Sequence, residues 1–446
     1  MPDRETIAAI ATPAGAGGIG VVRVSGPGVG LLARAMLGQL PVPRKATCSR
    51  IYDSDGEVLD TGIALFFPGP SSYTGEDVLE LQGHGGPVVL HMVLERCLSC
   101  GARLARPGEF TERAYLNGKL DLAQAEAVAD LINSSSEQAV RAAQKSLRGE
   151  FSARVLALVE QLTHLRMYVE SAIDFPDEEI DFPGQESVLK GLDGILDATS
   201  ELMASARQGR LLNEGMVVVL AGRPNAGKSS LLNALARIDR AIVSDTPGTT
   251  RDTIELHINI DGLPVTLVDT AGLREVDDEV ESEGVRRAEK AVRDADLVLY
   301  IVDDNRGGTV EHHADIPAAV PYTVVFNKID LSGRPAGPLD FDGQEALAIS
   351  AVSGRGLGKL RDHLMRRVGF QEIEGSEFLA RTRHLDAIQQ AQKHMEEGRR
   401  QLTETGAAEL LAEELRLAQR SLSGITGEFT SDDLLGRIFS TFCIGK

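Results

Sequence analysis

Short apolar runs set the pattern of the first part of the chain. The runs Thr6–Ile10, Val21–Val24 and Val78–Gln82 are separated by glycine and proline turns, and a longer apolar stretch follows at Pro87–Cys100. The runs predict β-strands and the longer stretch predicts a helix. We therefore expect a small α+β domain over residues 1–117.

The pattern changes at Leu120, beyond which proline is absent until Pro176. Apolar residues recur there at helical spacing, at Val155, Leu158, Val159, Leu162, Leu165 and Val169. This spacing predicts two or three long helices, and residues 371–446 again have a helical pattern. The acidic segment 174–186 could bind a cation, but we favour a solvated turn between helices.

From residue 216 to about 370 the order is strand, glycine loop, helix, repeated. Five near-continuous apolar runs predict the strands: Met216–Leu220, Leu263–Val268, Leu297–Val302, Thr323–Phe326 and Ala346–Ile349. Such runs, separated by helical stretches, predict a mostly parallel sheet covered on both faces. Because this sheet interrupts two helical stretches, we expect an α/β domain (211–370) inserted into a helical domain (118–210 and 371–446).

Composition and charge narrow the class of protein. The chain has 446 residues, 42% of them hydrophobic and 25% charged, as in an ordinary globular protein of several domains. Its formal net charge of −20 is not that of a typical nucleic-acid binder. A local basic patch is nevertheless present between Glu5 and Asp53, a stretch without acidic residues that carries Arg23, Arg34, Arg44, Lys45 and Arg50.

Cysteine usage and the absence of targeting segments point to the cytoplasm. Cys97 and Cys100 lie in an apolar run with no second Cys or His pair at zinc spacing, which favours buried thiols over a metal or redox site. No stretch reads as a signal peptide or a membrane span. We expect a cytoplasmic protein with no membrane association.

A glycine-rich loop follows the first strand of the expected α/β domain. The stretch Gly222-Arg-Pro-Asn-Ala-Gly227-Lys228-Ser229 fits the phosphate-binding loop. Its backbone N–H groups can surround a β-phosphate at the start of a helix. Lys228 is then placed to reach the β- and γ-phosphates, and the Ser229 hydroxyl to ligate magnesium. The expected contacts run through Asn225, Ala226, Gly227, Lys228, Ser229 and Ser230.

Three further motifs follow strands, where an open α/β sheet binds its ligand. They are Asp269-Thr270-Ala271-Gly272, Asn327-Lys328-Ile329-Asp330 and Ser350-Ala351. Asp269 can hold the magnesium shell. The Asp330 carboxylate can accept the N1–H and the N2 amine of guanine, donors that adenine lacks. A backbone N–H of Ser350-Ala351 can reach guanine O6. Together the motifs predict a GTP site.

The segment between the loop and Asp269 contains Gly248-Thr249-Thr250-Arg251-Asp252. Thr250 is placed to complete the magnesium shell together with Ser229 when the γ-phosphate is present. The residue after Gly272 is Leu273, whose apolar side chain cannot orient water. The site therefore needs another group for the water and another source of positive charge.

A glycine fingerprint near the N-terminus has a different interpretation. Gly15-Ala-Gly17-Gly-Ile-Gly20 fits the dinucleotide pattern, but the strand-like Val21–Val24 follows it where a helix is required. We expect a glycine-rich loop there, without a dinucleotide.

These motifs resemble those of the tRNA-modification GTPases called MnmE or TrmE, over the whole chain. The matching stretches are Gly222–Ser230, Gly248–Asp252, Asp269–Glu275, Leu116–Asp121 and Phe442–Lys446. The last two lie outside any generic GTPase and make the resemblance specific.

The resemblance implies that a potassium ion replaces an arginine finger, held by Asn225 and by backbone oxygens of Ser244, Thr246 and Thr249. It extends the nucleotide contacts over the segment Ser244, Asp245, Thr246, Pro247, Gly248, Thr249 and Thr250. It also implies catalytic roles for Lys228, Arg274 and Glu281, with Glu281 orienting the attacking water through a second water. The sequence alone does not distinguish Glu281 from its acidic neighbours Asp277, Asp278, Glu279 and Glu283.

The resemblance further implies that the N-terminal domain binds 5-formyltetrahydrofolate or a related tetrahydrofolate. The matching residues are Arg23, Glu80, Lys119 and Lys446, each of which would otherwise be interpreted as a surface charge. A pterin presents a donor edge similar to that of guanine, which suits Glu80. Cys443 could be a nucleophile, a structural thiol or a thiol lining the folate site.

The implied function is potassium-dependent GTP hydrolysis coupled to tRNA modification. A homodimer, in a heterotetramer or larger complex with an FAD-dependent partner resembling MnmG (GidA), would add a (carboxymethyl)aminomethyl group to C5 of the wobble uridine of certain tRNAs. The one-carbon donor would be of the formyltetrahydrofolate type. The alternative is a GTPase switch that acts as a ribosome or RNA assembly factor without modification chemistry.

Overall fold

The computed structural model describes residues 5–134, 136–174, 185–238, 255–269, 286, 290–306, 316–317, 320–367, 378–428 and 432–445. The chain divides into two compact units. The first comprises Met1–Ile132, Ser146–Ile195 and Gln390–Lys446, and the second comprises Asn133–Lys145 and Leu196–Gln389. Among the helices in these described ranges, none is long and apolar enough to cross a membrane.

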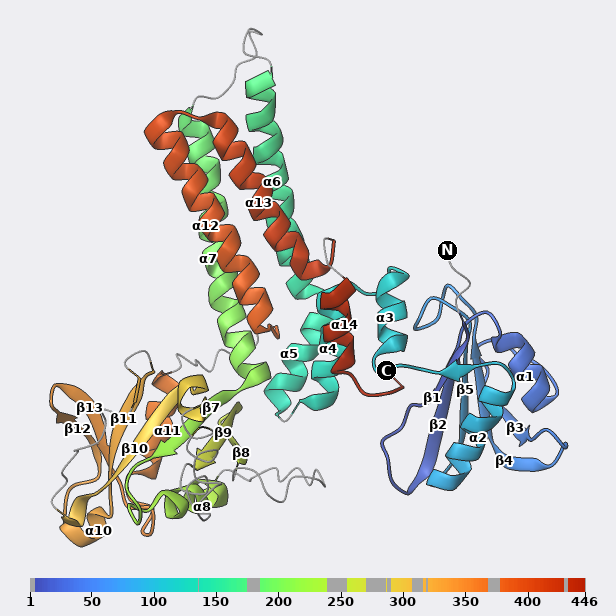
Figure 1. Cartoon of the computed structure of the whole chain (residues 1–446), viewed down its shortest axis with the longest axis horizontal. Helices are drawn as coiled ribbons and strands as arrows, with labels where there is room; N and C mark the ends of the chain where they lie inside the picture. Colours follow the sequence, from blue (N-terminus) through green and yellow to red (C-terminus); the bar gives the residue numbers. More distant parts are fainter. Residues whose placement is uncertain are drawn as a thin grey trace. The chain divides into compact units, whose positions relative to one another are not determined.

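A six-stranded sheet in the order β3-β4-β5-β2-β1-β6 begins the first unit (Figure 1). Its strands are β1 (Ile7–Ile10), β2 (Gly17–Ser25), β3 (Thr47–Tyr52), β4 (Val58–Phe67), β5 (Val78–Gly85) and β6 (Arg103–Leu104). Helices α1 (Val29–Leu37) and α2 (Pro87–Ser99) share one hydrophobic core with the sheet, which includes Leu79 and Leu81 of β5. A strand occupies the position where a dinucleotide site requires a helix, as predicted, but β2 begins at Gly17, so the expected glycine-rich loop is shorter than predicted.

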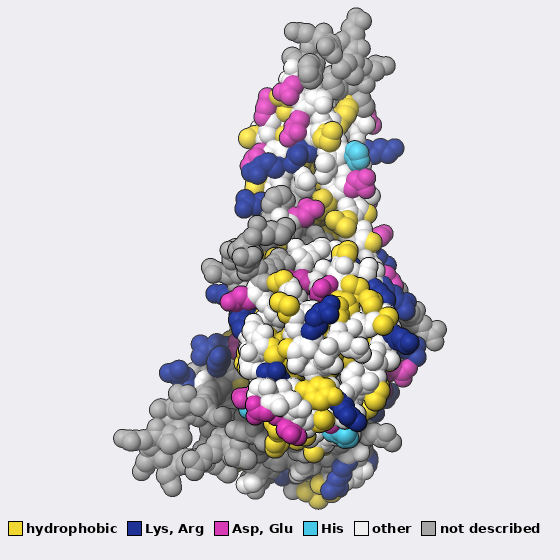
Figure 2. Space-filling model, turned by 90° about the vertical axis from the view of Figure 1, so that its right-hand side faces the viewer, with side chains coloured by type: hydrophobic (Ala, Val, Ile, Leu, Met, Phe, Trp, Pro, Cys, Tyr) yellow, Lys and Arg dark blue, Asp and Glu magenta, His cyan; other side chains and the backbone are white. Residues whose placement is uncertain are grey.

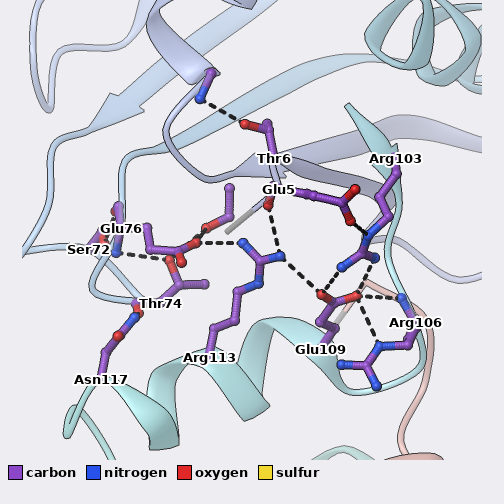
Figure 3. Close-up of polar contacts among 12 residues, drawn as sticks. Glu5, Thr6, Ser72, Thr74, Glu76, Arg103, Arg106, Glu109, Arg113 and Asn117 are labelled. Carbon is purple, nitrogen blue, oxygen red and sulfur yellow. Dashed lines mark hydrogen bonds and ion pairs between the residues drawn. The ribbon is translucent and has the colours of Figure 1, made fainter. Parts of the chain in front are cut away.

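Buried charges attach helix α3 (Glu109–Leu116) to this sheet (Figure 3). Glu109 is 2% exposed and accepts hydrogen bonds from Arg103 at 2.6 and 2.8 Å and from Arg113 at 3.0 Å. Arg113 also donates to Glu76 and to the backbone carbonyl of Glu5, both at 2.9 Å.

The network is a strong constraint on the position of α3. Burial alone raises the pKa of Glu109, but the hydrogen bonds from Arg103, the Arg106 N–H and Arg113 lower it to about 2. Glu109 is therefore charged at neutral pH. Removing one partner of such a pair leaves a buried charge uncompensated, at a cost of about 3–5 kcal/mol.

The rest of the first unit is helical. Its longest helices lie side by side in Figure 1 and are joined by polar contacts, such as Arg166 to Gln419 at 2.7 Å and His394 to Glu414 at 2.7 Å. The helices of the helical domain are α4 (Leu122–Asn133), α5 (Glu137–Leu147), α6 (Glu150–Asp174), α7 (Gln185–Glu214), α12 (Thr382–Thr405), α13 (Ala408–Thr426) and α14 (Asp432–Ser440). Of these, α5 belongs almost wholly to the second unit, and α7 and α12 are divided between the two units. Of those before the second sheet, α6 and α7 are the long helices that the sequence predicts.

A seven-stranded sheet in the order β12-β13-β11-β10-β7-β9-β8 forms the centre of the second unit. Its strands are β7 (Met216–Ala221), β8 (Glu255–Ile260), β9 (Leu263–Asp269), β10 (Leu297–Asp303), β11 (Tyr322–Asn327), β12 (Gly337–Phe341) and β13 (Gln344–Ala348). The five inner strands are parallel and the edge strands β8 and β12 are antiparallel. Along the chain, α8 (Lys228–Ile238) lies between β7 and β8 and α10 (Ile329–Ser332) between β11 and β12, whereas α11 (Leu357–Arg367) follows the last strand, β13.

The expected fold class is confirmed: an α+β domain, a helical domain and an α/β domain with a mostly parallel sheet. The predicted domain boundaries stay predictions. Helix α7 runs on to Glu214, so the expected boundary at 210 falls inside it.

A candidate nucleotide site at the edge of the second sheet

The glycine-rich loop occupies the turn from β7 to α8. Gly222 has φ +131° and Gly227 has φ +96°, a backbone region that favours glycine. A Cβ at Gly222 would lie 2.3 Å from the Ile301 carbonyl oxygen, and one at Gly227 would lie 2.3 Å from Asn327 Nδ2. The loop therefore needs glycine at both positions, because strand β10 and the Asn327 amide approach it so closely.

Two side chains at the start of α8 are held by this loop and by strand β9. Lys228 is buried, and its Nζ donates to the carbonyls of Gly222 at 2.8 Å and Arg223 at 3.1 Å. Its ammonium group thus lies within the curve of the loop, where such a lysine meets phosphates. Ser229 Oγ donates to Asp269 Oδ2 at 3.1 Å. A hydroxyl and a carboxylate together offer the hard oxygen ligands that magnesium prefers.

The Asn327 side chain joins three segments of the site. It lies at the end of β11 and is 1% exposed. Its Nδ2 donates to the Ala226 carbonyl at 3.0 Å, and its Oδ1 accepts the Ala351 N–H at 3.0 Å. The predicted donation of a Ser350-Ala351 N–H to guanine O6 stays a prediction. Here the Ser350 N–H donates to the Arg355 carbonyl at 2.8 Å and the Ala351 N–H to Asn327.

Lys328 crosses from the same strand end to the phosphate loop. It has φ +68°, and its Nζ donates to the Asn225 carbonyl at 2.7 Å and to Asp303 Oδ2 at 2.8 Å. Asp303 was not among the predicted site residues. The signal that could have revealed it is an acidic residue directly after the apolar run Leu297–Val302, at the sheet edge where the other motifs lie.

Asp330 is exposed, as a residue that binds a base must be. One carboxylate oxygen, Oδ1, accepts the Ser350 hydroxyl at 2.6 Å. The hydroxyl fixes the carboxylate and leaves a lone pair on Oδ1 and both lone pairs on Oδ2 for a ligand. Ile329 is buried beneath it.

Several predicted residues lie outside the described residues. These are Ser244, Asp245, Thr246, Pro247, Gly248, Thr249, Thr250, Thr270, Ala271, Gly272, Arg274, Glu281 and Lys446, together with Leu273. Ser230 is described and is exposed beside Ser229.

The first unit brings together three parts of the predicted folate site. Arg23 Nε donates to Glu80 Oε1 at 3.0 Å, and Arg23 NH1 donates to the backbone carbonyl of Gly445 at 3.3 Å. The guanidinium lies 5.5 Å from the ring centre of Tyr73 and 5.7 Å from that of Phe110. Lys119 is exposed, and the described residues offer its side chain no hydrogen bond or ion pair.

Of the two cysteines expected to be buried thiols, Cys97 is buried and Cys100 is half-buried. Burial raises the pKa of Cys97 to about 12, and its thiol contacts Met36 Sδ at 3.6 Å. Cys97 is therefore an inert core thiol at neutral pH. Cys443 is exposed.

Two family models match the chain. The model of the MnmE helical domain matches residues 122–443, and that of the GTP-binding protein TrmE N-terminus matches residues 6–119. The first alone spans more than half of the chain. The chain belongs to the MnmE/TrmE family. As an MnmE/TrmE protein it is a GTP hydrolase that takes part in tRNA modification and uses GTP with magnesium.

Solved structures of other GTPases are similar to part of this MnmE/TrmE chain. An Era variant of Aquifex aeolicus bound to GDP.AlF4- is 26% identical, with a TM-score of 0.27, and the match covers 41% of this chain and 67% of that one. The G domain of T. maritima FeoB is 24% identical, with a TM-score of 0.26, over 34% and 98% of the two chains. These scores are low, and the fold assignment depends on the sheet order and the family match.

The position of Asp330 leads to a prediction on base selection. Asp330→Asn should weaken GTP binding about 10- to 100-fold, because an amide cannot accept both guanine donors. The same amide can donate to the 2-oxo group of xanthine, so xanthosine triphosphate should bind more tightly to the variant than to the wild type. Titration with GTP, ATP and xanthosine triphosphate measures both effects.

The matched control is Asp362→Asn, a change at an exposed position on α11. Its nucleotide affinities should equal those of the wild type. If the Asp330→Asn variant kept the wild-type preference for GTP over ATP, the assignment of Asp330 as the residue that binds guanine would be contradicted.

Proposed function

We propose that this MnmE/TrmE protein is a potassium-dependent GTP hydrolase that modifies tRNA together with an FAD-dependent partner resembling MnmG. The reaction adds a (carboxymethyl)aminomethyl group to C5 of the wobble uridine of certain tRNAs. One observation carries the proposal. The MnmE helical-domain match over residues 122–443 includes a nucleotide site in which Lys228 donates to the Gly222 carbonyl, Ser229 to Asp269 and Asn327 to the Ala226 carbonyl.

GTP hydrolysis in this site depends on fixed charges around the phosphates. Lys228 neutralises the β- and γ-phosphates, and magnesium is held by Ser229 and Thr250 with Asp269 in its shell. Asp330 selects guanine, and the rest of the predicted set, from Ser244 to Gly272 and at Ser350 and Ala351, completes the nucleotide contacts. Glu281 orients the attacking water and Arg274 assists as a second catalytic residue.

Potassium dependence is proposed from Asn225 and its surroundings. Asn225 has φ +64°, and its carbonyl is fixed by the Lys328 ammonium at 2.7 Å. This hydrogen bond constrains the position of Asn225 in the loop. With backbone oxygens of Ser244, Thr246 and Thr249, its amide oxygen completes an all-oxygen set that suits a monovalent cation. A cation there supplies the positive charge that an arginine finger supplies elsewhere.

The folate site is proposed at Arg23, Glu80, Lys119 and Lys446. The Arg23–Glu80 pair is supported by its position against the end of the chain, one residue from Lys446. Glu80 can accept from the pterin edge, and the cations suit the anionic tail of 5-formyltetrahydrofolate or a related tetrahydrofolate. The N-terminal domain thus supplies the one-carbon donor.

Assembly is proposed to use the N-terminal domain. Figure 2 shows hydrophobic side chains on the face of this domain, and those with large exposed areas include Ile19, Leu31, Val88 and Met92. Such side chains support a homodimer through this domain. The complex with the flavoprotein, a heterotetramer or larger, acts on tRNA in the cytoplasm. The chain as a whole is acidic, with a net charge of −20, so the positive charge that attracts tRNA is local and is provided by Arg34, Arg44, Lys45 and Arg50.

Mass spectrometry of tRNA nucleosides tests the proposed function. Deletion of the gene should remove the modified wobble uridine, and the wild-type chain should restore it. Lys228→Ala should not restore it, because hydrolysis requires the phosphate-binding lysine. The control Lys359→Ala, at an exposed position on α11, should restore it fully.

Wobble uridines that stay unchanged in the deletion strain would reject the proposal. That outcome would favour the alternative, a GTPase switch that assists ribosome or RNA assembly.

Potassium dependence is tested by GTP turnover in matched salts. Replacing sodium by potassium should raise the turnover number at least about 10-fold, since a fixed charge at the phosphates typically contributes more than 1.4 kcal/mol. Asn225→Ala should abolish this increase, whereas Asn233→Ala, exposed on α8, should keep it. Equal turnover in both salts would contradict the potassium site and point to an arginine from a partner.

A further inference from the structure

An acidic side chain at the end of strand β10 is oriented by its own backbone toward Lys328. Asp303 pairs with Asn327 in the register of the parallel strands β10 and β11. Its Oδ1 accepts the backbone N–H of Asn305 at 3.1 Å, and its Oδ2 accepts Lys328 Nζ at 2.8 Å. The first bond closes a local turn into the short helix η2 (Asp304–Arg306). The carboxylate is therefore held at the strand end where the lysine meets it.

Lys328 joins this carboxylate to the phosphate loop. Besides Asp303, its Nζ donates to the Asn225 carbonyl at 2.7 Å. The Lys328 side chain is 27% exposed and that of Asp303 is 14% exposed, so solvent screens the pair only in part. A lysine stem is flexible, and fixing its ammonium costs rotamer entropy. Without the carboxylate, the ammonium would gain freedom by leaving the loop for solvent.

The contact between Lys328 and the loop joins two residues of unusual backbone conformation. Asn225 has φ +64° and Lys328 has φ +68°, in the left-handed region that side chains disfavour. Asp261 and Asp342 also have positive φ, but each precedes a glycine in a two-residue hairpin turn that requires it. Asn225 lies in the phosphate loop and Lys328 precedes α10, so neither has that reason. Their conformations persist because neighbouring contacts hold them.

The backbone of Asn225 sets where the side chain proposed to bind potassium begins. A change of φ rotates the Cα–Cβ bond relative to the loop, so relaxation out of the left-handed region would carry the amide oxygen away. The hydrogen bond from Lys328 opposes this relaxation by fixing the Asn225 carbonyl. A ligand atom that is already in place binds more tightly than one that must be ordered on binding.

We propose that Asp303 is a positioning residue for the monovalent cation. Through Lys328 it keeps Asn225 in its left-handed conformation, so that the amide oxygen is in place for the cation. This role rests on the proposed potassium dependence and adds to it a residue that acts two contacts away from the cation.

A potassium titration of GTP turnover tests this role. Potassium replaces sodium at constant ionic strength, so that the changed charge of a variant acts on both cations alike. Asp303→Asn should raise the potassium concentration for half-maximal activation about 10-fold, the effect of losing a hydrogen bond to a charged group. Its turnover number in saturating potassium should equal that of the wild type. The control Asp362→Asn, exposed on α11, should match the wild type in both quantities.

Nucleotide binding gives a readout that does not depend on turnover. GDP with aluminium fluoride imitates the phosphoryl group in transfer, so its affinity reports a cation at the phosphates. Potassium should tighten this binding to the wild type relative to sodium. At a potassium concentration that just saturates the wild type, Asp303→Asn should lose most of this gain. The affinity of either protein for GDP alone in sodium should be the same.

A double-mutant cycle shows whether Asp303 acts through Lys328. Lys328→Met keeps a long stem, removes the ammonium and should also raise the half-activation concentration. Adding Asp303→Asn to Lys328→Met should change this concentration less than about 2-fold, because residues in one chain of contacts are not additive. Full additivity of the two changes would overturn the proposed role.

The remaining outcomes separate this role from the proposed function. A half-activation concentration in Asp303→Asn equal to that in Asp362→Asn would overturn the role of Asp303 and leave potassium dependence intact. A loss of GDP affinity in sodium as large as the loss of potassium activation would also overturn it, since Asp303 would then support the nucleotide site as a whole. Equal turnover of the wild type in both salts would instead reject the proposed potassium dependence, and the role of Asp303 with it.

Discussion

The buried amide of Asn327 is the contact on which the nucleotide site depends. It donates to the phosphate loop at Ala226 and accepts from the last loop at Ala351, and it does so from the end of a central parallel strand. A buried amide with both groups paired is favourable only in this one arrangement of the three segments, since any other would leave a polar group unpaired. The loop glycine at 227 follows from the same contact, because a side chain there would collide with the amide.

The lysine that follows Asn327 extends this constraint to catalysis. Lys328 connects Asp303, at the end of the neighbouring strand, with the carbonyl of Asn225. Asn225, which is proposed to bind potassium, is therefore held by Lys328 of the motif Asn327–Asp330, which is proposed to bind guanine. In the first unit, buried charges likewise fix the position of an element, since the Glu109–Arg113 network holds helix α3. Phe110 on that helix contacts the Arg23 guanidinium, which donates a hydrogen bond to Glu80.

Sequence reasoning succeeded where the determinants are local. The phosphate loop, Asp269, the Asn327 motif and the apolar runs of the inner strands lie at the strand ends and strands where they were predicted. Strands β3, β4, β6, β8 and β12 and helices α1 and α3 were not predicted. The edge strands lack the continuous apolar runs of strands buried on both faces. The contact of Asp303 with Lys328 joins the ends of two different strands, which spacing along the chain does not reveal.

The central claim is that the Asn327 amide holds the nucleotide site together, and Asn327→Asp tests it most directly. Aspartate has nearly the same shape but cannot donate to Ala226 and would place a negative charge at the loop carbonyl. The account predicts that the dissociation constants of GTP and GDP rise at least about 10-fold, a loss of about 1.4 kcal/mol or more. Asn233→Asp, on the exposed face of α8, should leave both constants unchanged. Unchanged nucleotide affinity in Asn327→Asp would contradict the account.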